Sequence, residues 1–285
     1  MKLKTAAKIN LSLDVTGKLE NGYHTIQSFF QTVGIYDIID INITDGNDIK
    51  LSCSKPYIPC NEKNIAYKAV SLFRESCNKN FGCKIDIQKY IPSQAGMGGG
   101  SSDGAAVLFA LNKLLKTNYS FEKMVEIGAK LGADVPFFLM GGTAYAEGIG
   151  EKLKKAPDYS NKIIVIGKGH EGVSTVEAYK LIDNLENPQH PQTELLAKSL
   201  ENGGDDAYKY FANIFEYACN LNTVKNIKSI MLDNGAKNAV MTGSGSAVFG
   251  LFDNKKSAEN CCNILKNEKY YSKICKTISR SFEIL

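Results

Sequence analysis

The residues with the clearest chemistry are the glycines and serines of segment 91–103, which reads Ile-Pro-Ser-Gln-Ala-Gly-Met-Gly-Gly-Gly-Ser-Ser-Asp. Glycine adopts backbone conformations that other residues avoid, and it lets a ligand approach the main chain closely. The segment predicts a helix that opens at Ser101 and Ser102. The first amides of a helix have no partner within it, and its dipole favours an anion. The segment therefore predicts a phosphate-binding loop on an enzyme.

No standard nucleotide motif fits this loop. A Walker A loop places a lysine directly after its last glycine, and no lysine follows these glycines. The dinucleotide fingerprint Gly-x-Gly-x-x-Gly also fails, because its last glycine falls on Ser101 when counted from Gly96 and on Asp103 when counted from Gly98. A flexible turn remains an alternative, since glycine clusters usually form turns. The Ser-Ser-Asp sequence and the amphipathic helix that follow favour phosphate binding.

The period of the apolar residues predicts the elements that hold this loop. Alternation or apolar runs predict strands at 9–15, 35–43, 84–91, 141–146 and 163–166. Helical spacing predicts a helix over 64–74, one directly after the glycine loop, and one from a Ser120 cap to Gly132. Two apolar runs around 242–246 predict two strands joined by a glycine turn. This mixture lacks regular strand–helix–strand alternation, so we expect an α+β fold.

Composition limits the classes of function. The 285 residues suffice for one large or two modest domains, and the hydrophobic fraction of 44% is ordinary for a globular protein. The net charge of +4 comes from dispersed lysines. It suits an anionic small molecule and gives no reason to expect a nucleic-acid partner. A polar, proline-bearing stretch at 154–161 predicts a boundary between a domain at 1–155 and a domain at 156–285.

The cysteines and the start of the chain predict a cytoplasmic protein. The eight cysteines form no Cys-x-x-Cys pair and no Cys/His ligand set, so reduced thiols are expected. Lys8, Asn10 and Asp14 interrupt any signal-peptide core near the start. No apolar run approaches the length of a membrane span, and we expect no membrane association.

The glycine loop also resembles the ATP loop of the GHMP kinases, which include galactokinase and the homoserine, mevalonate and phosphomevalonate kinases. Further segments resemble the 4-diphosphocytidyl-2-C-methyl-D-erythritol kinase family within that superfamily. They are Ala-Lys-Ile-Asn-Leu at 7–11, Gly-Tyr-His at 22–24 followed by Gln27, Gly-Ala-Asp-Val-Pro-Phe-Phe at 132–138 and Met-Thr-Gly-Ser-Gly-Ser at 241–246. These segments occur in the family's order and span most of the chain.

The resemblance implies a two-domain fold, with an N-terminal ribosomal S5-like nucleotide-binding domain and a C-terminal ferredoxin-like α/β domain. It implies an ATP-dependent kinase that phosphorylates the 2-hydroxyl of 4-diphosphocytidyl-2-C-methyl-D-erythritol to give the 2-phosphate and ADP, in the non-mevalonate route to isoprenoids. The partners expected are ATP and this small-molecule substrate, with the chain a monomer or a homodimer. Mg²⁺ is expected with ATP, with Ser101 or Ser102 as a possible ligand.

The resemblance also assigns roles to residues. Lys8 and Asp134 match the catalytic pair. Asn10 lies on the same strand face as Lys8 and is expected to hold substrate hydroxyls. Tyr23 and His24 match the dipeptide that recognises cytosine, by stacking and by hydrogen bonding, and Tyr179 is the expected second aromatic. The residues implied in ATP binding are Lys89, Pro92, Ser93, Gln94, Ala95, Gly96, Met97, Gly98, Gly99, Gly100, Ser101 and Ser102, and those implied near the substrate diphosphate are Gly243, Ser244 and Gly245.

Some residues also have an ordinary structural explanation. Asp134 precedes Pro136 and could cap a helix without any catalytic role. Gly243 and Gly245 could merely form a hairpin turn. Gln94 and Gly104 depart from the family's usual small residue and alanine, and prolines expected before Val173 are missing. Another small-alcohol kinase or a nucleotide sensor without activity remains an alternative, which the Tyr23–His24 pair and the retained Lys8 and Asp134 disfavour.

Overall fold

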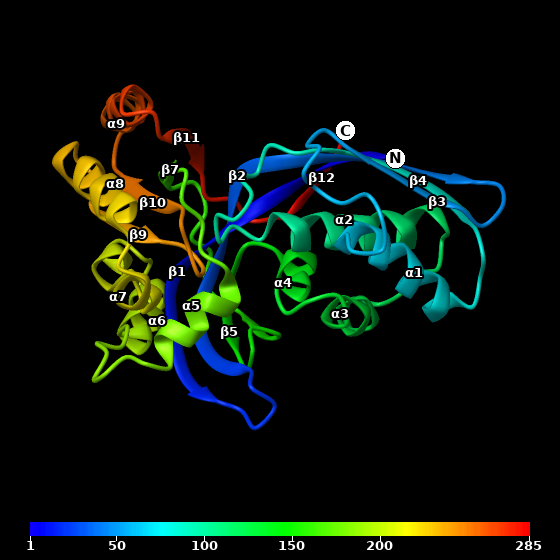
Figure 1. Ribbon diagram of the computed structural model, residues 1–285, viewed down its shortest axis with the longest axis horizontal. Helices are drawn as coiled ribbons and strands as arrows, with labels where there is room; N and C mark the ends of the chain where they lie inside the picture. Colours follow the sequence, from blue (N-terminus) through cyan, green and yellow to red (C-terminus); the bar gives the residue numbers. More distant parts are fainter.

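A computed structural model describes residues 1–285 and contains two β-sheets with helices packed on them (Figure 1). The larger sheet has eight strands, and its main path runs in the order β12-β1-β2-β4-β3. Its strands are β1 (Lys2–Lys18), β2 (His24–Thr44), β3 (Ile49–Cys53), β4 (Gly82–Gln88), β5 (Thr143–Glu147), β6 (Lys152–Lys155), β8 (Ala212–Asn213) and β12 (Phe282–Ile284).

Strands β1 and β2 form one long antiparallel hairpin whose turn contains residues 19–23. Register shifts at Ala6/Ala7, Asn10/Ser12 and Val15/Gly17 interrupt the ladder, and such irregularities bend and twist a strand pair. The strand β1 is longer than the predicted 9–15. The polar residues Lys8, Asn10, Ser12 and Asp14 alternate with the apolar ones and are all buried. Both faces of β1 are therefore covered, and its polar face is available for a site.

Four helices cover one face of the larger sheet (Figure 1). They are α1 (Ile65–Cys77), α2 (Gly99–Leu114), α3 (Phe121–Ala129) and α4 (Val135–Met140). The predicted Ser120 cap is confirmed, because its side chain accepts from the Lys123 amide. The side chain of Asn64 caps α1 in the same way, by accepting from the Ala66 amide. The prediction that α3 reaches Gly132 was wrong. The helix ends at Ala129, and the chain then turns toward Asp134.

The smaller sheet is antiparallel, in the order β11-β7-β10-β9. Its strands are β7 (Ile163–Lys168), β9 (Asn238–Met241), β10 (Val248–Phe252) and β11 (Tyr271–Lys276). The remaining helices of the chain are α5 (Thr175–Ile182), α6 (Thr193–Glu201), η1 (Ala207–Tyr210), α7 (Phe215–Cys219), α8 (Asn222–Asp233) and α9 (Lys255–Asn267). Helices α8 and α9 pack on this sheet. Strands β9 and β10 are joined at 242–247, as the sequence predicts.

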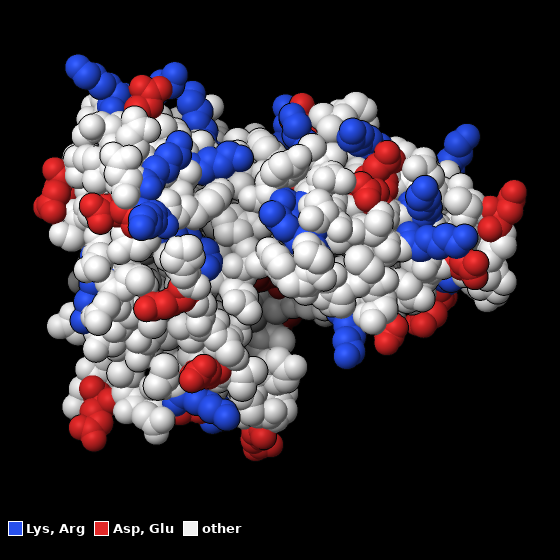
Figure 2. Space-filling model, turned by 45° about the horizontal axis from the view of Figure 1, so that its top comes forward, with Lys and Arg blue, Asp and Glu red and all other residues white.

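The predicted α+β class is confirmed, because helices pack on both sheets and most neighbouring strands are antiparallel. The short strands β8 and β12 belong to the larger sheet although they come late in the chain, and the two termini lie near one another (Figure 1). The division at residue 155 stays a prediction. No helix has the length and apolar character needed to cross a membrane. All eight cysteines are unpaired. Lysine, arginine and acidic side chains are interspersed on the face in Figure 2.

Candidate active site

The glycine loop connects β4 to α2, as predicted, and lines a cavity of 1110 Å³. Helix α2 begins at Gly99, two residues earlier than the serines suggested, with Gly98 at its N-cap. The first helical hydrogen bond runs from the Ser102 amide to the Gly98 carbonyl at 2.9 Å. The amides of Gly99, Gly100 and Ser101 precede that bond, and all three residues line the cavity. Such amides at a helix N-terminus suit a phosphate group.

At two glycines in this loop, any side chain would be strained and would overlap its neighbours. Gly96 and Gly98 have φ values of 69° and 70°, in the left-handed region that side chains rarely adopt. A Cβ on Gly96 would lie 2.0 Å from the Thr242 carbonyl oxygen. A Cβ on Gly98 would lie 2.8 Å from the Phe138 ring and 3.2 Å from Lys8 Cγ. The main chain of the loop packs so closely on Thr242, Phe138 and Lys8 that positions 96 and 98 require glycine.

The loop at 242–245 packs against the glycine loop and is held by Asn10. The Asn10 Oδ1 atom accepts hydrogen bonds from Thr242 Oγ1 at 3.1 Å, the Gly243 amide at 3.0 Å and Lys8 Nζ at 3.0 Å. Its Nδ2 donates to Ser28 Oγ at 2.9 Å, and the residue is 1% exposed. The polar atoms of Asn10 are thus engaged inside the protein, so the side chain positions Lys8 and the second loop.

Lys8 and Asp134 meet in the cavity although they lie far apart in the chain. The Lys8 Nζ atom lies 3.6 Å from Asp134 Oδ2 and 4.6 Å from the centre of the Phe30 ring. Lys8 is 5% exposed, whereas the Asp134 side chain is 31% exposed and opens to the cavity. At this separation the attraction between the charges is about 5 kcal/mol for an effective dielectric of about 20, before desolvation.

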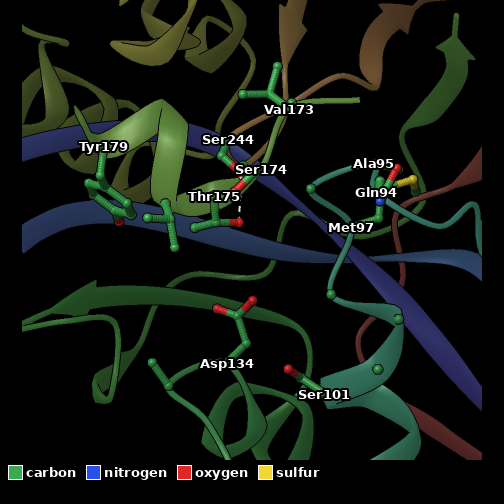
Figure 3. A pocket seen from close by; sticks show the side chains of 18 of the residues that line it. Gln94, Ala95, Met97, Ser101, Asp134, Val173, Ser174, Thr175, Tyr179 and Ser244 are labelled. Atoms are coloured by element: carbon green, nitrogen blue, oxygen red, sulfur yellow. Dashed lines mark hydrogen bonds between the residues drawn. The ribbon is translucent and has the colours of Figure 1, made fainter. Parts of the chain in front are cut away.

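The structure disfavours a purely capping role for Asp134. The residue occupies the N-cap position of α4, but its backbone is helical, with φ −79° and ψ −16°, and its side chain makes no cap hydrogen bond. An N-cap residue usually has extended backbone and accepts from an amide of the first turn. The carboxylate instead points into the cavity, toward the region that Ser101 also faces (Figure 3).

The two serines of the glycine loop differ in accessibility. The Ser101 hydroxyl faces the cavity (Figure 3). Ser102 is fully buried, where its hydroxyl donates to the Ala6 carbonyl at 2.6 Å and lies 2.5 Å from Thr5 Oγ1. The Ser102 hydroxyl is therefore not free to contact ATP or magnesium as predicted. We assign Ser102 a structural role, which is to join the start of α2 to β1. No group of three or more acidic, histidine or cysteine side chains forms a metal cluster.

The predicted ATP residues other than Ser102 all line the cavity. Lys89 does so with its ammonium already bound by two buried carboxylates, those of Asp37 and Asp103. Burial raises the pKa of Asp103 to about 8, with the Lys89 charge opposing this and the Asp37 charge adding to it. Burial lowers the pKa of Lys89, but Asp103 and Asp37 more than reverse this, so its net pKa is raised. Contact of Lys89 with adenosine stays a prediction.

The predicted base-recognition residues lie together at another part of the same cavity. Tyr23 is 60% exposed in the β1–β2 turn, and His24 is the first residue of β2. The His24 ring stacks on Tyr179 with centroids 4.6 Å apart and an interplanar angle of 19°. Burial raises the pKa of Tyr179 to about 12, and the nearby Asp134 charge adds to this, so its hydroxyl stays neutral.

The predicted substrate loop contacts the first residue of α5. Ser244 Oγ lies 3.1 Å from Thr175 Oγ1 (Figure 3). Gly243, Ser244 and Gly245 all line the cavity. Because the 242–245 loop packs on the glycine loop as described above, it is more than a hairpin turn.

Three residues near the site carry roles that the sequence did not suggest. Asp37 organises the entry to the glycine loop, because its Oδ1 accepts from the amides of Tyr90 and Ile91 at 2.6 and 2.9 Å. Asp183 binds His24, and Lys18 binds Asp183. The spacing of four residues between Tyr179 and Asp183 could have indicated a shared helix face. Nothing in the sequence marked Asp37.

Comparison with known proteins gives consistent matches. The family model of the GHMP kinases N terminal domain matches residues 64–142, and that of the GHMP kinases C terminal matches residues 182–272. The 4-diphosphocytidyl-2-C-methyl-D-erythritol kinase of Clostridium perfringens (strain ATCC 13124) is 44% identical over 277 residues, 96% of each chain. The enzyme of the same name from Clostridium beijerinckii is 41% identical over 98% of this chain and 100% of its own.

Solved structures with the same fold include a kinase with the same substrate name. A crystal structure of 4-(cytidine 5′-diphospho)-2C-methyl-D-erythritol kinase superposes with a TM-score of 0.82 at 29% identity, and the match covers 97% of this chain and 99% of that one. A homoserine kinase from Cytophaga hutchinsonii superposes with a TM-score of 0.78 at 18% identity, over 100% and 97% of the two chains. At that identity the homoserine kinase shows a shared fold alone.

Proposed function

The chain belongs to the GHMP kinases, in the family of 4-diphosphocytidyl-2-C-methyl-D-erythritol kinases, and we propose that it transfers the γ-phosphoryl group of ATP to the 2-hydroxyl of that substrate. The products are the 2-phosphate and ADP. The observation that carries this proposal is the Lys8–Asp134 pair, 3.6 Å apart, facing the glycine loop across one cavity.

In the proposed reaction the amides at the start of α2 bind the phosphates of ATP. Asp134 accepts a hydrogen bond from the 2-hydroxyl and takes its proton as the oxygen bonds to the γ-phosphorus and the bond to the departing ADP breaks. Lys8 holds the Asp134 carboxylate and offsets negative charge at the transferred group. Phosphoryl transfer depends mainly on alignment and on charge stabilisation, and a buried lysine fixed by Asn10 and Phe30 supplies both.

The cytidine part of the substrate is proposed to lie against Tyr23, His24 and Tyr179. The exposed ring of Tyr23 offers a stacking surface, and His24 offers a hydrogen-bonding group at the cavity wall. A homoserine or mevalonate kinase would have no use for this pair, because those substrates lack a nucleobase. The full-length relatives at 41–44% identity also favour the cytidine substrate.

Magnesium is proposed to enter with ATP, where it would supply positive charge to the phosphates. Ser101 is the residue that could contact it, because its hydroxyl faces the cavity and that of Ser102 does not. A cytoplasmic location is proposed on the eight unpaired thiols, which suit a reducing compartment. The chain is proposed to act as a monomer or a homodimer.

The test is steady-state kinetics of Asp134→Ala with the cytidine substrate. We expect kcat to fall by about 10²–10⁴-fold, the usual contribution of a positioned base, while ATP affinity changes little. Helix α4 should remain folded, because Asp134 makes no cap hydrogen bond. Asp45→Asn, at an exposed turn, is the matched control and should retain full activity. Unchanged turnover in Asp134→Ala, or a preference of the wild type for homoserine or mevalonate, would contradict the proposal.

A further inference from the structure

His24 is bound by a helix from the other half of the chain. Its Nε2 atom lies 2.6 Å from Asp183 Oδ1, across a separation of 159 residues. The second oxygen of that carboxylate lies 2.5 Å from Lys18 Nζ. Lys18 and His24 are cross-strand partners at the end of the β1–β2 hairpin, and Asp183 is the C-cap of α5. The three side chains therefore form a contact between the hairpin and α5 at the rim of the cavity.

The orientation of the His24 ring is also set from its face. Tyr179, one helical turn before Asp183, stacks on the imidazole. Tyr179 is itself held edge-on by Phe215, with centroids 5.0 Å apart and an interplanar angle of 86°. The His24 side chain is 8% exposed. A ring stacked on one side and hydrogen-bonded at Nε2 has little freedom to rotate.

The Asp183 contact determines where the imidazole proton resides. An ionised carboxylate only accepts hydrogen bonds, so Nε2 must donate to it and carry the proton. In a neutral imidazole Nδ1 is then an acceptor. Nδ1 has no hydrogen-bond partner in the protein and is not among the buried unsatisfied atoms, and His24 lines the cavity. The protein thus presents an acceptor nitrogen to a bound ligand.

We infer that Asp183 is a positioning residue that fixes the His24 tautomer, so that Nδ1 selects a pyrimidine with an exocyclic amine over one with a carbonyl at the same position. This inference rests on the proposed function. Cytosine can donate a hydrogen of its exocyclic amine to Nδ1. Uracil has a carbonyl oxygen at that position, and this oxygen and Nδ1 are both acceptors, so no hydrogen bond can form. A site built around such a hydrogen bond rejects the analogue that cannot form it.

The alternative is that Asp183 only joins the hairpin to α5. Two measurements separate the roles. The first is the ratio of kcat/KM for the cytidine substrate to that for its uridine analogue, because loss of a structural contact would lower both values together. The second is the ¹⁵N NMR spectrum of the imidazole, which reports the tautomer of His24 without any activity.

The experiment compares wild type with Asp183→Ala, Asp183→Asn and Lys18→Met. We expect the wild type to carry its proton on Nε2, and Asp183→Ala to lose this preference and about tenfold or more of the cytidine-to-uridine ratio. Asparagine keeps an acceptor oxygen and should restore most of the ratio. Lys18→Met keeps the carboxylate and should leave the ratio within about threefold of wild type.

The outcomes distinguish this inference from the proposed function. A wild type that prefers the cytidine compound, with Asp183→Ala equally selective, overturns the inference alone. So does a wild-type His24 that carries its proton on Nδ1, a result that needs no folded variant. A wild type that phosphorylates neither nucleoside compound overturns the proposed function, and the base selection inferred from it falls as well.

Discussion

Substitution of Gly98 by alanine tests whether the glycine loop, Lys8 and α4 form one closely packed unit. The residue has a φ of 70°, so alanine is strained there before any contact is considered. The added Cβ would also lie 2.8 Å from two atoms of the Phe138 ring and 3.2 Å from Lys8 Cγ. Phe138 is fully buried, and the centre of its ring lies 5.5 Å from that of Phe137, so the Phe138 ring has little room to move away from an added Cβ.

The magnitude follows from these two effects. Left-handed backbone costs an alanine about 1–2 kcal/mol. Overpacking of a filled core costs about 1–3 kcal/mol more. The free energy of unfolding should therefore fall by about 2–5 kcal/mol. Any relaxation moves the loop amides or Lys8, and a displacement on the order of 1 Å at such a site can lower kcat/KM by about a hundredfold.

Urea unfolding and steady-state kinetics would measure both changes. Gly100→Ala is the matched control in the same loop, since its Cβ would meet only Ile65 Cδ1 at 3.6 Å, an ordinary contact, and its φ is not left-handed. It should unfold within about 0.5 kcal/mol of wild type. If Gly98→Ala were as stable and as active as Gly100→Ala, the packing argument would be refuted.

Two further predictions concern the buried cluster of Lys89, Asp37 and Asp103. Lys89→Met leaves the Asp37 carboxylate buried without its counter-charge and should lower the free energy of unfolding in urea by about 3–5 kcal/mol. Adding Asp37→Asn, which keeps an acceptor oxygen for the Tyr90 and Ile91 amides, should partly recover this loss, and wild-type stability in Lys89→Met would contradict the prediction. Because burial raises the pKa of Asp103 from 3.8 to about 8, the folded protein keeps a proton between those pH values that the unfolded chain releases. The free energy of unfolding should thus fall by at least about 1.4 kcal/mol as pH rises through this range. The fall should be smaller in Asp103→Asn. If the free energy of unfolding depended on pH equally in the two proteins, the explanation would be ruled out.

The parts of this protein that local chemistry dictates were predictable from the sequence. Side chains of Asn64 and Ser120 cap helices because the partners they need lie two or three residues away. The glycine loop was predictable for the same reason, since a strand, a run of glycines and a helix follow one another directly. The helix start was misplaced, because Gly98 rather than a serine hydroxyl occupies the N-cap.

The resemblance of short segments to a known family added residues that spacing alone could not identify. Lys8 and Asp134 were assigned in this way, and the structure brings them to 3.6 Å. Asn10 was expected to hold substrate, but its polar atoms are used within the protein. A sequence shows which side chain is present, and only its neighbours show whether its hydrogen bonds are already made.

The contacts between distant segments were decided by the tertiary structure. Asp183 meets His24, and Asp37 meets Lys89, because the hairpin of β1 and β2 contacts both α5 and the strand that leads to the glycine loop. No periodicity encodes such a meeting, since it depends on how whole elements pack. The sequence by itself determined which elements form and which loop can bind phosphate, through interactions over a few residues. The packing of those elements decided which charges are paired, which hydroxyl remains free, and which nitrogen of His24 is bound by Asp183.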